Sequence, residues 1–148
     1  MFIESLRSLY NRDLNKLKAE IEAYQNEENL WKTDKNIANC GGNLCLHLLG
    51  NLNSFIGAEL GKTGYVRQRD LEFSLKNIPK AELIAKVEAT VIMADSVLGQ
   101  LSDDDLKKEY PLEPLGYEMT TDYFLIHLIT HLDYHLGQIN YHRRLLDI

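Results

Sequence analysis

Apolar side chains recur at steps of three and four residues in four stretches of the chain. The first stretch, about residues 2–25, has such a line at Leu6, Tyr10, Leu14, Leu17, Ile21 and Tyr24. Similar lines occupy about residues 43–60, 79–101 and 122 to nearly the end. Because these steps place side chains on one face of an α-helix, the pattern predicts four long amphipathic helices.

The segments between these stretches are long and contain helix-breaking residues. Residues 26–43 are polar and include paired glycines, with room for a short turn around Trp31; residues 102–120 hold two prolines and a glycine. Residues 61–80 look too irregular for a helix. Strand signals are nearly absent. We therefore expect one all-α domain over residues 1–148, a four-helix bundle whose long connections can cross the bundle.

Composition narrows the environment of the protein. The chain has 148 residues, of which 45% are hydrophobic and 26% charged, so it can fold on its own core without a structural metal. No apolar run is long enough to span a membrane, and the first residues mix charge with apolar side chains, which predicts a cytoplasmic protein without a membrane partner. The net charge of −6, with scattered basic residues, argues against nucleic acid as a partner. The spacing of Cys40 and Cys45 predicts free thiols.

The last predicted helix places polar groups on a line that should face the core. This line passes through Phe124, Leu128, His131, His135, Gln138, His142 and Leu145. Buried imidazoles need hydrogen bonds, water or a metal, since an unpaired buried polar group is costly. A second, apolar line from Leu125 to Leu136 could face the core instead, and the histidines would then lie at an exposed edge.

His131 and His135 lie one helical turn apart, so their imidazoles can converge on one metal ion. The intervening sequence lacks the glutamate of a zincin protease, and the chain has no glutamate three residues before a histidine, as di-iron bundles require. What remains is a mononuclear site that needs a third ligand from another helix. His47 is the only histidine outside the last helix, although a partly exposed histidine without a role is an equal alternative.

Two other histidines are expected not to be ligands. His127 lies one turn before His131, but three histidines in a column span about 12 Å of helix rise and cannot all reach one ion. We therefore place His127 beside the site, and we expect His142 to lie outside it.

Three stretches together resemble the DinB-like superfamily: HLLGNLNSF at residues 47–55, RQRDLEFS at 67–74 and HLDYHLGQINYHRRLL at 131–146. The resemblance implies a four-helix bundle with a long crossover, in which one histidine of the second helix and the HxxxH pair of the last helix bind a divalent transition metal such as Zn, Ni, Fe or Mn. On this chain those ligands are His47, His131 and His135.

The resemblance also implies a function. Relatives look like metal-dependent thiol transferases, so we expect a thiol S-transferase or hydrolase that uses a low-molecular-weight thiol and forms a homodimer. Residues expected to support the site or meet substrate are Asn51, His127, Gln138, Arg67 and Arg69. No side chain stands out as a general base. Two alternatives stay open: a metal- or ligand-binding stress-response protein without turnover, and a structural bundle whose histidines are hydrogen-bonded core residues.

Overall fold

The computed structural model describes residues 1–148 and is built from helices. Four long helices form its body: α1 (Phe2–Ala23), α2 (Gly41–Leu52), α5 (Lys80–Gly99) and α7 (Thr121–Leu146). Shorter ones lie between them: a 3-10 helix η1 (Glu27–Trp31), a π-helical turn η2 (Asn53–Ala58), α3 (Glu59–Gly61), α4 (Arg69–Ser74) and α6 (Asp103–Lys107). The only β-type pairing is an isolated bridge between Glu109 and Thr120. The predicted all-α bundle is therefore confirmed.

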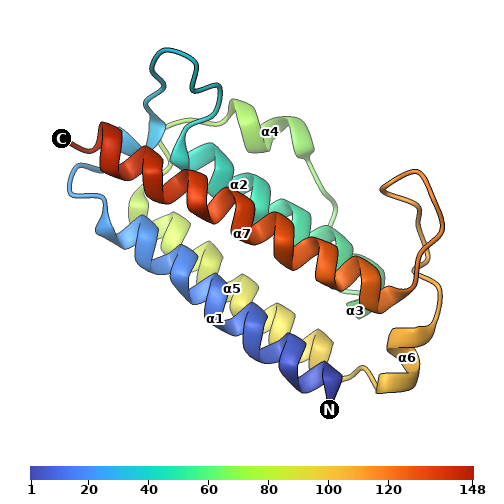
Figure 1. Cartoon of the computed structure of the whole chain (residues 1–148). Helices are drawn as coiled ribbons and strands as arrows, with labels where there is room; N and C mark the ends of the chain where they lie inside the picture. The colour runs from blue at the N-terminus through green and yellow to red at the C-terminus, as the bar shows by residue number, and fades with distance from the viewer.

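The long helices run up, down, down and up. The Tyr10 hydroxyl donates to the carbonyl oxygen of Leu125, and the Tyr24 hydroxyl lies 2.7 Å from Nδ1 of His142, so α1 and α7 are parallel neighbours. In Figure 1, α2 and α5 lie behind this pair and run the opposite way. Since α2 and α5 point in the same direction, the chain between them must travel back along the bundle. That crossover carries α4 along the outer side of α2 (Figure 1).

Helix α2 is buried along its entire length. Every residue from Gly41 to Leu52 is buried, because α5 and α7 pack on α2 from the bundle and the crossover covers its outer side. The side-chain amide of Asn43 donates to the carbonyl oxygens of Glu72 and Leu75, which fixes the crossover to the helix. Polar groups of α2 therefore face protein on all sides and need partners there.

On α7, the apolar line predicted from the sequence faces the core: Leu125, Ile129 and Leu132 are buried. The histidine line is mixed: Phe124, Leu128 and His142 are buried, His131 and His135 are half-buried, and Gln138 and Leu145 are exposed. His131 and His135 therefore lie at the edge of the core, where α7 faces α2.

One expectation about the connections is wrong. Residues 61–80 contain a helix, α4, which is too short for periodicity to reveal and is anchored to α2 through Asn43. The third connection likewise contains α6, which Ser102 caps by accepting a hydrogen bond from the Asp105 backbone N–H. The short turn expected around Trp31 is present as η1.

Two further expectations can be compared with the structure. Cys40 and Cys45 are both free and buried, as predicted. None of the helices combines the length and the apolar character required to cross a membrane.

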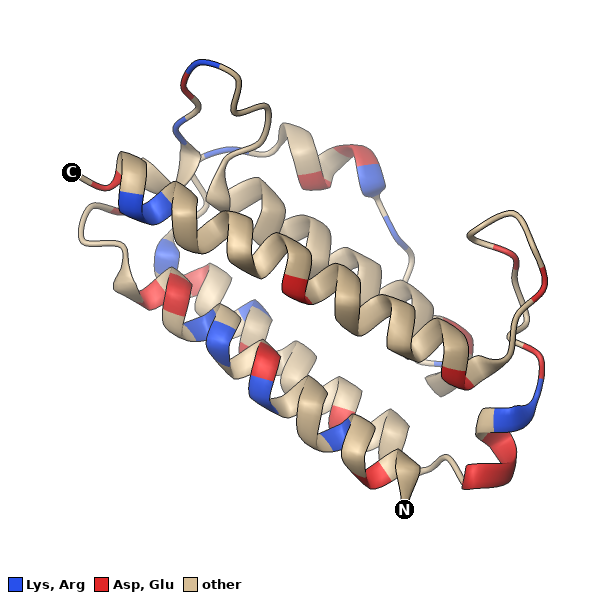
Figure 2. Ribbon diagram, viewed as in Figure 1, with Lys and Arg blue, Asp and Glu red and all other residues tan.

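Charged side chains of both signs alternate along α1, whereas α7 carries few (Figure 2). One of these few, Asp133, has its carboxyl close to that of the fully buried Asp13 of α1. Burial, together with the Asp13 carboxylate, raises the pKa of Asp133 to about 6. A raised carboxyl pKa means that the fold favours the protonated form, so this contribution to stability is present at low pH and is lost as the pH rises through about 6.

We therefore expect Asp133→Asn to stabilise the protein at neutral pH. Asparagine keeps a hydrogen-bond donor toward Asp13 but cannot ionise. In thermal melts the variant should melt above the wild type at about pH 7.5, and the difference should shrink as the pH falls toward about 4. A variant that melts below the wild type at neutral pH would contradict the carboxyl pairing.

Candidate metal centre

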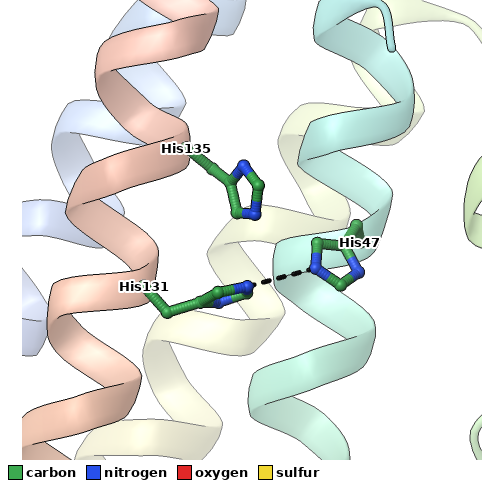
Figure 3. Close-up of side chains that lie close together, drawn as sticks. All are labelled: His47, His131 and His135. Carbon is green, nitrogen blue, oxygen red and sulfur yellow. Dashed lines mark hydrogen bonds between the residues drawn. The ribbon is translucent and has the colours of Figure 1, made fainter. Parts of the chain in front are cut away.

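Three histidines from two helices converge inside the bundle. Figure 3 shows His131 and His135 of α7 pointing toward His47 of α2 across the space between the helices. The Nε2 atoms of His47 and His131 are 3.2 Å apart. One ring nitrogen from each of the three residues lies within 4.8 Å of the others. The residues expected as ligands are thus brought together, and they could hold a metal ion.

His47 is oriented by a buried carboxylate. Its Nδ1 lies 3.1 Å from Oε1 of Glu72, so Nδ1–H donates and the Nε2 lone pair faces the other histidines. Arg67 holds the same carboxylate with Nε 2.9 Å from Oε2 and Nη2 3.0 Å from Oε1. Burial alone would raise the pKa of Glu72, but the hydrogen bonds from His47 and Arg67 outweigh it and lower that pKa. An ionised carboxylate behind a ligand histidine is the usual support of a metal site.

Glu72 was not predicted from the sequence. A single glutamate in a charged loop has no distinctive pattern, and only the crossover brings it to His47. The sole available signal was its place in RQRDLEFS, one of the stretches that carry the family resemblance.

His135 is oriented in a similar way. Its Nδ1 lies 2.7 Å from Oε1 of Gln138, so Nδ1–H donates to the amide oxygen and Nε2 keeps its lone pair. Gln138, which was expected to support the site, thus contacts one of the three converging histidines.

His131 is the least satisfied of the three. Its Nδ1 is buried without a hydrogen-bond partner. Burial, followed by the neighbouring His135 and His47, lowers the pKa of His131 to about 4. Burial also lowers the pKa of His135, against the effect of the Gln138 hydrogen bond. Both imidazoles are thus neutral at neutral pH, which is the form that binds metal.

His142 shows what a structural histidine looks like in this protein. It is buried, its Nδ1 lies 2.7 Å from the Tyr24 hydroxyl, and its Nε2 lies 2.8 Å from the carbonyl oxygen of Lys32. Both nitrogens therefore have partners, and His142 lies outside the site, as expected. The three converging histidines differ because their Nε2 atoms face one another. Three converging imidazole nitrogens, two of them on rings whose Nδ1–H is held by an acceptor, fit a divalent transition metal.

The other expected residues surround this group. The ring of His127 stacks near that of His131 at a centroid distance of 6.4 Å, yet His127 is not one of the converging ligands. Arg67 is paired with Glu72, which places it behind His47. Asn51 and Arg69 line a cavity of about 320 Å³ that is also lined by His47 and His131.

Comparison with known families gives one result. The model of a family described as "Protein of unknown function (DUF1572)" matches residues 1–147. No curated protein matches the chain. The match therefore takes in all of the long helices and the three histidines, and it brings no activity with it.

Proposed function

The chain belongs to the DUF1572 family of proteins of unknown function, and we propose that it is a DinB-like, divalent-metal-binding thiol S-transferase or hydrolase. The observation that carries this proposal is the convergence of His47, His131 and His135, whose ligand nitrogens lie within 4.8 Å of one another. The up-down-down-up bundle and the origin of the ligands on α2 and α7 agree with the DinB-like resemblance.

The arrangement also supports an open coordination position. Three protein ligands leave a first-row metal with room for a further group, as in catalytic rather than structural sites. The cavity lined by His47 and His131 gives that group a place to bind. A bound divalent ion would lower the pKa of a thiol or water in this position, and a thiolate or hydroxide is the nucleophile that transfer or hydrolysis needs.

The protein's own residues would keep this site in order. Glu72 and Gln138 fix the tautomers of His47 and His135, so that both Nε2 lone pairs point to the centre. Phe55 and Leu115 form an apolar wall of the cavity, suited to an organic electrophile.

A structural role for the histidines explains less. A hydrogen-bonded core histidine such as His142 has partners from other residue types at both nitrogens, whereas His47 and His131 turn their Nε2 atoms toward each other, 3.2 Å apart, beside His135. That contrast favours the metal-binding function over a purely structural bundle.

The proposed function can be tested by turnover on tag-free protein loaded with one divalent metal at a time. Cysteine with 1-chloro-2,4-dinitrobenzene tests thiol transfer, and p-nitrophenyl acetate tests hydrolysis. We expect one of these reactions to run at least about tenfold faster with the wild type than with His131→Ala, since the site would supply the activated nucleophile. If the wild type binds metal but reacts no faster than His131→Ala, with both at the background rate, the result would instead support a metal-binding protein without turnover.

A further inference from the structure

The cavity beside the three histidines has an unusual lining. It measures about 320 Å³ and is bounded by α2, α7, the crossover and the connection that contains Pro114 and Leu115. Two arginines, Arg67 and Arg69, are among its lining residues, and no aspartate or glutamate is. In a protein of net charge −6, such a lining favours an anion over a cation.

Asn51 presents a polar group to this cavity without a partner in the protein. It lies one turn after His47 on α2 and is only 7% exposed. Its Oδ1 is buried and accepts no hydrogen bond. An oxygen in this state needs a hydrogen-bond donor from outside the chain, because an unpaired buried polar group destabilises the fold.

The two arginines differ in how their charge is used. Arg67 donates two hydrogen bonds to Glu72, so the two charges cancel. The guanidinium of Arg69 lies 5.5 Å from the centre of the Phe73 ring and takes part in none of the ion pairs of the structure. Phe73 in turn packs on His47, with ring centres 4.9 Å apart. The exposed Arg69 thus contacts Phe73, which packs on His47, and it has no ion-pair partner.

We propose that this cavity binds a small organic carboxylate with an apolar body. Arg69 pairs with the carboxylate, a hydroxyl or amine of the same ligand donates a hydrogen bond to Oδ1 of Asn51, and Phe55 and Leu115 contact its apolar part. The inference rests on the proposed function, because it names the class of molecule that lies beside the metal ligands.

The test uses two probes of equal shape and different charge, 3-phenyllactate and 3-phenyllactamide, which carry the same hydroxyl as a donor for Asn51. Their dissociation constants are measured by calorimetry with purified wild-type protein, Arg69→Ala and Arg144→Ala. Arg144 is a matched control: it is exposed, stacks on the Tyr141 ring at 5.1 Å, and removing it changes the net charge equally. Metal content is determined in the same samples.

The wild type should bind the carboxylate about tenfold or more tightly than the amide, as expected for a charge-assisted hydrogen bond. In Arg69→Ala the two probes should bind within about twofold of each other, while Arg144→Ala keeps the wild-type preference. Equal binding of both probes to the wild type, no binding of the carboxylate, or a preference that survives in Arg69→Ala would overturn the inference. If the carboxylate bound the metal directly, the preference for the carboxylate would persist in Arg69→Ala. The variant therefore distinguishes metal binding from pairing with Arg69. If the samples contain no metal, this counts against the proposed function alone. The ratio of the two dissociation constants can still be measured and still tests the carboxylate site.

Discussion

Replacing His131 or His135 with alanine is expected to abolish stoichiometric binding of divalent metal and to leave the protein folded. Each variant has only two of the three converging imidazoles, which is below the number of protein ligands usual at such sites. Loss of a residue that only hydrogen-bonds to a ligand lowers metal affinity about 10–100-fold. Loss of a ligand itself should lower the metal affinity by more than this. Helical content should persist, because the core lines of α1 and α7 are untouched and His131 contributes no hydrogen bond through Nδ1.

Elemental analysis after dialysis and far-UV circular dichroism measure both effects. His127→Ala is the matched control, since it removes an imidazole from the same helix that stacks on His131 without joining the ligand group. The control should retain metal. Full metal occupancy in both His131→Ala and His135→Ala would refute the site.

Replacing Gly50 with alanine should lower metal affinity about 10–100-fold, although no ligand is changed. A Cβ at Gly50 would lie 1.8 Å from Oε2 and 2.5 Å from Cδ of Glu72. Glu72 is only 6% exposed and is held by His47 and Arg67, so its carboxylate must leave its place. His47 would then lose the acceptor that fixes its tautomer and ring position.

The backbone should tolerate this change, because alanine is favoured over glycine in a helix interior by about 1 kcal/mol. Gly137→Ala on α7 gives the comparison: a Cβ there meets nothing within 4 Å. Competition with a chromophoric chelator should therefore show weaker metal binding in Gly50→Ala and wild-type binding in Gly137→Ala. Equal affinities in the two variants would show that Glu72 does not support His47.

The four long helices could be predicted because each carries apolar residues over several turns. The pairing of His131 and His135 could also be predicted, since both lie on one helix, one turn apart. Glu72 was not, because its contact with His47 depends on the parallel course of α2 and α5, which forces the crossover to run along α2. The role of Gly50 was hidden for the same reason. For His47 the sequence left a partly exposed histidine without a role as an equal alternative, and only the complete burial of α2 puts its imidazole inside the protein.

The central claim is that three imidazoles hold one metal ion, and anomalous diffraction at the absorption edge of the bound metal tests it most directly. Crystals of tag-free, metal-loaded protein should show one peak per chain between α2 and α7. The Nε2 atoms of His47, His131 and His135 should each lie about 2.0–2.2 Å from that peak. A peak elsewhere in the bundle, or one in which an aspartate, glutamate or cysteine replaces one of these histidines, would contradict the account.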